Sequence, residues 1–206
     1  GKWVFVPNDE CRRRGRRITE YCEKRWEFPD YYYHYRDGGH VAALHAHLDN
    51  KFFFHIDLQN FFYSISRNRV TRALKGFGYR EARTFATWSC VRNPYPGPRY
   101  TLPFGFVQSP ILASLVLMQS PLGEAIRELT KDGVTVSVYM DDIIGSSDDE
   151  ELLEEAYEEI LEACEKAGFP VNEEKTQPPA DAITAFNCDL THGCMEVTEE
   201  RMAEFY

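Results

Sequence analysis

The chain has 206 residues, 43% of them hydrophobic, and a formal net charge of −10. This length suits one domain with a substantial core. No apolar stretch reaches the roughly 18–20 residues that a membrane-spanning helix needs, so no membrane span is expected. The six cysteines include no Cys-x-x-Cys pair, which favours free thiols and a cytoplasmic location.

The charge is distributed unevenly along the chain. Residues 1–140 hold 20 Lys and Arg against 13 Asp and Glu, a net charge of +7, whereas residues 141–206 have a net charge of −17. The basic part begins with the run Arg12-Arg13-Arg14-Gly15-Arg16-Arg17, which suits contact with phosphates or, equally, a generic basic loop. A second candidate stripe of phosphate-facing cations lies on a predicted helix and comprises Arg67, Arg69, Arg72 and Lys75.

Aromatic and histidine residues follow the basic run. The segment Tyr31-Tyr32-Tyr33-His34-Tyr35 could stack on bases, or it could be buried. His40, His45 and His47 have no partners at zinc-site spacing and are expected to pack in a helix that leads to the next strand. The run Phe52-Phe53-Phe54-His55-Ile56 predicts that strand, which ends at Asp57.

The middle of the chain is predicted to be largely helical. Helices are expected over residues 67–75 and 79–91, and again over residues 110–129. Ser109-Pro110 supplies a helix cap followed by proline at the first helical position. Ser120-Pro121 is expected to restart or kink the last of these helices.

A hairpin with acidic residues at its tip is predicted next. Strands are expected over residues 134–140 and 142–147, because apolar and polar residues alternate there. Tyr139-Met140-Asp141-Asp142 lies between them and would form a tight turn. Such a turn presents adjacent carboxylates, which are the hard oxygen ligands that Mg²⁺ prefers. Ordinary polarity of a hairpin turn is the competing explanation.

The last part of the chain is strongly acidic. An amphipathic helix is predicted over residues 149–167 and ends at Gly168. The acidic face of this helix is expected to be solvated. Lys175 follows in a polar segment, where a solvated surface lysine is the ordinary interpretation. A final strand is predicted over residues 184–190.

Three of these segments together resemble motifs of reverse transcriptases, especially the bacterial retron and group II intron kinds. Residues 57–65, Asp-Leu-Gln-Asn-Phe-Phe-Tyr-Ser-Ile, resemble the first palm motif of that family. Residues 102–110 resemble its Leu-Pro-Gln-Gly-x-x-x-Ser-Pro motif, and residues 139–142 resemble its Tyr-x-Asp-Asp box. Their order and spacing agree with the family, and with weaker matches the resemblance covers roughly residues 30–190.

The resemblance implies a metal site. Asp57 and Asp141 would be metal ligands, Asp142 would complete the catalytic carboxylate cluster, and the backbone carbonyl of Leu58 would add an oxygen. The implied cofactor is a pair of Mg²⁺ ions, for which Mn²⁺ is the alternative.

The resemblance also implies a nucleotide-binding site. Phe62 falls at the steric gate that excludes the ribose 2′-hydroxyl, although a core aromatic residue beside Phe61 is the alternative. Phe104 stands where the family has Gln, which removes a polar contact near the nucleotide and could introduce stacking. Gly105 would permit close approach of the backbone to a nucleotide or template base.

Two basic residues complete the implied nucleotide site. Lys175 matches a motif in which a lysine lies near the leaving pyrophosphate. Arg16 loosely matches an arginine that contacts the nucleotide phosphates.

The expected fold is α+β, a polymerase palm with an antiparallel sheet backed by helices, together with part of the fingers. Residues 1–50 are assigned to the fingers, and residues 51–190 to the palm with fingers helices around 67–100. Residues 191–206 are assigned to the start of a connection to a thumb, and they are too few to form a helical thumb. The thumb is therefore expected to be absent and to come from another segment or a partner protein.

The predicted function is RNA-directed DNA polymerase, adding dNTPs to the 3′-hydroxyl of a primer on a template by two-metal phosphoryl transfer. Phe104 and the missing thumb leave open a defence-associated polymerase that makes DNA without normal templating. A non-catalytic nucleic-acid-binding subunit on the same scaffold is a further alternative, disfavoured because clustered carboxylates repel phosphate. The natural template, the primer, the biological role and the oligomeric state are left open, and the resemblance favours a bacterial host.

Overall fold

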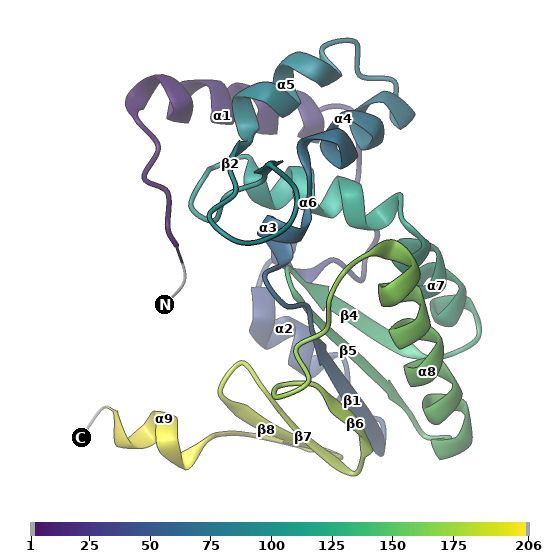
Figure 1. Ribbon diagram of the computed structural model, residues 1–206. Coiled ribbons are helices and arrows are strands. Elements are labelled where there is room, and N and C mark those ends of the chain that lie inside the picture. Colours follow the sequence, from purple (N-terminus) through teal and green to yellow (C-terminus); the bar gives the residue numbers. More distant parts are fainter. Residues whose placement is uncertain (1–2, 205–206) are drawn as a thin grey trace.

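A four-stranded antiparallel sheet lies at the centre of the protein, in the strand order β4-β5-β1-β6. The fold is given by a computed structural model that describes residues 3–204 (Figure 1). The four strands are β1 (Phe52–Asp57), β4 (Thr135–Tyr139), β5 (Asp142–Ser147) and β6 (Gln177–Ala180). The predicted limits of β1 and β5 are confirmed. β6 was not predicted, because its two prolines are residues that only an edge strand tolerates.

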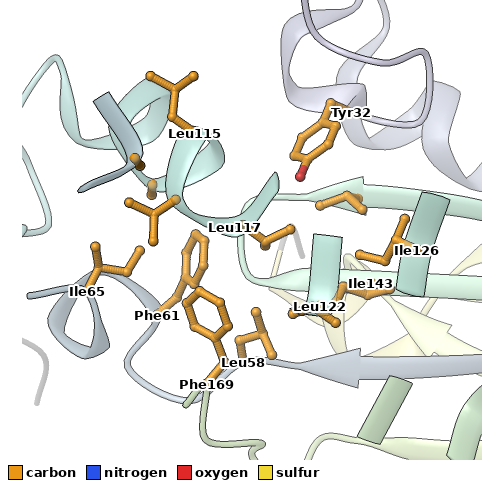
Figure 2. Close-up of a cluster of buried hydrophobic side chains, with 14 of the residues drawn as sticks. Tyr32, Leu58, Phe61, Ile65, Leu115, Leu117, Leu122, Ile126, Ile143 and Phe169 are labelled. Carbon is orange, nitrogen blue, oxygen red and sulfur yellow. The ribbon is translucent and has the colours of Figure 1, made fainter. Parts of the chain in front are cut away.

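Two long helices cover one face of this sheet. They are α7 (Pro121–Lys131) and α8 (Glu150–Ala167), seen beside the sheet in Figure 1. The main hydrophobic core lies beneath them and extends under α6 (Ser109–Met118), where Figure 2 shows Leu58, Phe61 and Phe169 close together. None of the helices within residues 3–204 is long and apolar enough to cross a bilayer.

A second, smaller sheet packs on the opposite face. It consists of β7 (Ala182–Ala185), β8 (Cys188–Thr191) and β9 (Cys194–Val197). The single strand predicted over residues 184–190 is therefore wrong, because the chain reverses at Phe186-Asn187. Both residues have positive φ, 53° and 60°, as a type I′ turn requires.

The remaining elements lie mostly in the upper part of Figure 1. The helices are α1 (Asp9–Glu23), α2 (Gly39–His45), α3 (Phe61–Ser64), α4 (Arg67–Gly76), α5 (Ala82–Ser89), α6 (Ser109–Met118) and α9 (Glu199–Ala203), with the 3₁₀ helix η1 (Tyr33–Tyr35) and the short strands β2 (Val91–Arg92) and β3 (Tyr100–Thr101). The predicted break at Ser120-Pro121 is confirmed, since α6 ends before it and α7 begins there.

The N-terminal basic run forms a helix and not a loop. The side chain of Asn8 caps α1 by accepting a hydrogen bond from the backbone N–H of Cys11. Asp9 and Glu10 in the first turn form ion pairs with three of the arginines, Arg12, Arg13 and Arg14. In the aromatic run of residues 31–35 that follows, Tyr32 is only 1% exposed and the other four residues are half-buried. Of the two alternatives for that run, burial is the better description.

His47 follows α2 and joins it to the sheet. The ring is fully buried, with Nδ1 2.6 Å from the hydroxyl of Ser146 and Nε2 2.8 Å from the hydroxyl of Ser137. Burial lowers the pKa of His47 from 6.5 to about 3, so the folded protein holds the ring neutral. Two hydroxyl groups suit this form, because a neutral imidazole donates one hydrogen bond and accepts another.

The depressed pKa of His47 predicts a loss of stability in acid. The unfolded chain takes up a proton on this ring as the pH falls below 6.5, whereas the folded chain does not until about pH 3. The contribution of His47 is therefore complete above pH 6.5 and declines below it. Between about pH 7.5 and 5.5, the free energy of unfolding should fall by about 1 kcal/mol more for the native chain than for His47→Gln. Denaturant titrations at the two pH values measure this difference, and equal pH dependence would contradict it.

Gly145 lies opposite Phe54 in the pairing of β5 with β1. A Cβ atom at this position would lie 2.3 Å from the ring of Phe54, which is fully buried. Gly145→Ala should therefore lower the free energy of unfolding by about 1–3 kcal/mol through overpacking. In a Phe54→Leu background, Gly145→Ala should lower the free energy of unfolding by less, because the smaller leucine side chain leaves room for the added methyl group. Equal costs in the two backgrounds would show that the clash is not the cause.

Candidate active site

The register of β1 and β5 places two aspartates side by side. Asp57 and Asp142 are direct partners across the two strands. Directly opposed residues in antiparallel strands project from the same face, so these carboxylates are neighbours on the face away from α7 and α8. Asp141 precedes Asp142 in the turn that joins β4 to β5. The structure therefore brings Asp57 together with Asp141 and Asp142, which lie more than 80 positions later in the sequence.

The turn is a two-residue loop of Met140 and Asp141, closed by the pair Tyr139 and Asp142. Met140 has a φ of 58°, while Asp141 is not in the positive-φ region. A positive φ at the first loop residue alone is the pattern of a type II′ turn, which usually carries glycine there. The backbone N–H of Leu58 donates to the carbonyl of Asp141 at 2.8 Å. This hydrogen bond links the residue that follows β1 to the turn.

Asp57 is nearly buried, with 7% of its surface exposed, and the segment after α8 surrounds it. Its Oδ1 accepts from the side-chain amide of Asn172 at 3.1 Å, and its Oδ2 lies 3.4 Å from Nζ of Lys175. Its backbone carbonyl accepts from the N–H of Asn172, and its own N–H donates to Thr176. Lys175 therefore lies beside Asp57, although its side chain is 59% exposed.

His55 is a residue of this site that the sequence analysis did not identify. It is buried on the same face of β1 as Asp57, and its Nε2 lies 2.7 Å from Oδ1 of Asp142. The side chain of Gln177 is oriented by Thr184, to whose carbonyl it donates and from whose N–H it accepts. The amide nitrogen of Gln177 consequently faces Nδ1 of His55 at 3.3 Å, which leaves the proton on Nε2 to be donated to Asp142.

A sequence signal for His55 was present. Residues two apart on a strand share a face, so a polar residue two positions before Asp57 in an otherwise apolar run pointed to the same surface. Gln177 carried no such signal, because β6 joins the sheet at its edge in a segment not predicted to be a strand.

The three aspartates line one open cavity of about 470 Å³. Its wall also includes His55, Glu174, Lys175, Gln177, Thr184, Ala185, Phe186, Asn187, Thr198 and Glu200. Phe186, at the tip of the β7–β8 hairpin, contacts Tyr139 beside the acidic turn with ring centroids 5.4 Å apart. His40 lies 5.9 Å from Tyr139 and 5.5 Å from Phe186, so three rings tie the small sheet to the turn.

The donors in this cavity suit a divalent cation chemically. Carboxylate and carbonyl oxygens are the ligands that Mg²⁺ prefers. Within residues 3–204, however, no group of three or more His, Cys, Asp or Glu side chains encloses a space for a metal ion. Instead, the carboxylate of Asp57 contacts the side chains of Asn172 and Lys175, and the carboxylate of Asp142 contacts His55. Two of the three aspartates therefore have other side chains of the protein as partners.

Apart from Lys175, the residues predicted to bind the nucleotide lie outside this cavity. Phe61 is buried against Phe169, whereas Phe62 is partly exposed and faces Phe104 at 6.0 Å between centroids. The two adjacent rings lie 5.4 Å apart between centroids, and Phe62 packs at the edge of the core to which Phe61 belongs. Phe104 is 47% exposed. Arg16 is exposed on α1, and like these phenylalanines it is not among the described residues that line the aspartate cavity.

Gly105 makes its close approach to the protein's own N-terminal segment. It has a φ of 103°, and a Cβ atom there would lie 2.6 Å from the carbonyl oxygen of Phe5. The N–H of Phe5 donates to the carbonyl of Phe104 at 3.2 Å. The backbone of residue 5 therefore occupies the space that the sequence analysis assigned to a nucleotide or template base.

Comparison with known proteins identifies the class. A family model described as "Reverse transcriptase (RNA-dependent DNA polymerase)" matches residues 9–187. The chain belongs to the reverse transcriptase family. Its fold is similar to telomerase from Candida albicans, solved in complex with a fragment of telomeric RNA, with a TM-score of 0.60, 10% identity and coverage of 89% of this chain and 36% of that one. The predicted palm fold, an antiparallel sheet backed by helices, is confirmed.

Two curated relatives are similar to parts of the chain. It is 30% identical over 175 residues to the retron Mx65 reverse transcriptase of Myxococcus xanthus, which covers 76% of this chain and 40% of the relative. It is 32% identical over 125 residues to the Gag-Pol polyprotein of Rous sarcoma virus subgroup C (strain Prague), which covers 59% of this chain and 7% of that one. The chain thus spans less than half the length of these relatives.

Proposed function

We propose that this chain carries the polymerase site of an RNA-directed DNA polymerase that adds dNTPs to the 3′-hydroxyl of a primer. The observation that carries the proposal is the pairing of Asp57 with Asp142 beside the turn that holds Asp141. Membership of the reverse transcriptase family supports the same reaction at a coarser level. In this assignment, residues 51–190 form the palm, and residues 1–50 with α4 and α5 belong to the fingers. Residues 1–2 lie outside the described residues.

The predicted boundary between the palm and a connecting segment falls within the small sheet. Leu190 is part of β8, and β8 pairs with β9 beyond residue 191. In our assignment β9 therefore belongs with β7 and β8, at the edge of the aspartate cavity. Residues 205–206, the end of the predicted connection, lie outside the described residues.

Asp57 and Asp141 would hold the divalent cations, with the carbonyl of Leu58 as a further oxygen ligand. When bound, a pair of Mg²⁺ ions, or Mn²⁺ in their place, would activate the attacking oxygen and stabilise the leaving one. Asp142 has a supporting role, because the hydrogen bond from His55 fixes its carboxylate. Lys175 is positioned at the exposed rim beside Asp57, from where its ammonium group can turn to a phosphate of the nucleotide.

The nucleotide would lie between this cavity and the ring of Phe62. Phe62 is partly exposed and contacts the half-exposed ring of Phe104, so both can contact a substrate. A bulky ring at this position leaves no space for a ribose 2′-hydroxyl. Phe104 supplies stacking in place of an amide contact. Gly105 can accept a substrate only if the segment at Phe5 moves away, and Arg16 on the fingers helix would contact the triphosphate.

Asp141→Asn tests the proposed activity most simply. It removes one negative charge and leaves the size of the side chain nearly unchanged. The rate of Mg²⁺-dependent extension of a DNA primer on an RNA template should fall by at least about 100-fold, because the charge that holds the cations is lost. Asp132→Asn, at the solvent-exposed end of α7, is the matched control and should keep full activity. Thermal melting should be unchanged in both, and extension by Asp141→Asn at the native rate would refute the assignment.

Phe62→Ala tests the selection of the sugar. Removing the ring opens space beside the 2′-hydroxyl, so the preference for dNTPs over NTPs should fall by at least about tenfold, measured as the ratio of kcat/KM values. Phe61→Leu, in the neighbouring core position, serves as the control and should leave the ratio unchanged. An unaltered ratio in Phe62→Ala would remove the gate role and leave the metal site untouched.

A further inference from the structure

The solvent face of α4 is strongly basic in a protein whose net charge is −10. The helix contains no acidic residue, and its exposed or half-exposed positions include Arg67, Arg69, Arg72 and Lys75. Among the described residues, no carboxylate lies within ion-pair distance of these four side chains. This differs from α1, where neighbouring acids neutralise three of the arginines.

The first of two hollows along α4 is lined by three cations. Arg69, Arg72 and Lys166 border a cavity of about 440 Å³, which Ser120 at the start of α7 also lines. No carboxylate is among its lining residues within the described chain. Lys166 forms an ion pair with Glu162 one turn back along α8, so part of its charge is offset.

Arg69 lines this hollow and contacts the segment that follows α8. Its guanidinium lies 4.2 Å from the centre of the Phe169 ring, and it donates to the carbonyl of Gly168 at 3.3 Å. Burial, followed by the charge of Arg72, lowers the pKa of Arg69 to about 10. A half-buried cation whose partners are a ring and carbonyl groups, with another cation beside it, is stabilised when an anion enters.

The second hollow lies at the N-terminal end of α4 and combines cations with an aromatic ring. It has a volume of about 410 Å³, and Arg67, Asn68, Arg99 and Tyr100 line it. The guanidinium of Arg67 lies 4.6 Å from the ring centre of Tyr100, and that of Arg99 lies 5.4 Å from it. Cation–π contacts of this kind hold the two arginines in place. Neither hollow shares a lining residue with the aspartate cavity.

We propose that these two hollows and the face of α4 between them form a binding track for single-stranded nucleic acid, separate from the aspartate cavity. Phosphates bind to Arg69, Arg72 and Lys166, and bases stack on the cluster of Arg67, Tyr100 and Arg99. Cations that follow a backbone, joined to a planar stacking surface, are the combination by which proteins bind single strands without sequence preference. Two hollows on one helix favour a chain of phosphates over a single small anion.

The test measures binding without any metal, so it does not depend on the proposed polymerase activity. A fluorescently labelled 30-nucleotide oligo(dT) is titrated in EDTA with the native chain and with the double variant Arg67→Gln/Arg72→Gln. This variant spares Arg69 and its contacts with Phe169 and Gly168. The matched control is Arg127→Gln/Lys131→Gln on α7, which removes the same charge from a surface where Glu128 pairs with both residues.

At about 0.1 M salt, the double variant on α4 should bind oligo(dT) at least about tenfold more weakly than the control. The slope of log K against log salt should become shallower by about 0.7, because the phosphate contact of Arg72 is lost, while the loss of Arg67 weakens base stacking. Thermal melting of both variants checks the fold. Binding equal to the control, or an equal loss of affinity for a blunt 20-base-pair duplex, would overturn the proposal. So would loss of binding to inorganic phosphate alone with oligo(dT) affinity unchanged, since it would mark a small-anion site.

Discussion

The antiparallel pairing of β1 with β5 is the constraint on which the rest of the site depends. In its observed register, Asp57 opposes Asp142 on the outer face, while Ile56 opposes Ile143 on the face covered by helices. A slip of one residue would turn Asp57 into the core and bring its apolar neighbours into the cavity. The register is fixed sterically, because the ring of Phe54 occupies the space above Gly145 and no side chain fits there.

The surrounding segments orient the carboxylates of Asp57 and Asp142 through hydrogen bonds. Asn172 and Lys175 engage the carboxylate of Asp57, and His55 engages that of Asp142. His55 is oriented by Gln177, which is itself fixed by the backbone of Thr184 in the small sheet. The β7–β9 sheet is thereby connected to the acidic turn through a chain of hydrogen bonds as well as through ring contacts. Displacement of that sheet would change the hydrogen bonds that orient the carboxylate of Asp142.

The central strands and the acidic turn were predictable because their signals are local. The alternation of apolar and polar residues predicted β4, and a continuous apolar run predicted β1. Ser120-Pro121 predicted the break between two helices. The contacts of Asp57 with Asn172 and of His55 with Asp142 were not predictable, since each joins residues more than 80 positions apart. The turn at Phe186 was missed because neither of its residues is the glycine that usually marks positive φ, and the close approach of Phe5 to Gly105 leaves no local signal.

We propose that Asp57 and the aspartates of the turn act on one shared group of divalent cations. Titration of Mn²⁺ in the presence of a dNTP, followed by electron paramagnetic resonance, measures this directly for the native chain, Asp57→Asn, Asp141→Asn and the double variant. If the ligands are shared, each single substitution should weaken Mn²⁺ binding by at least about tenfold, and the double variant should be little worse than the poorer single one. Native affinity in either single variant, or losses that simply add, would contradict it.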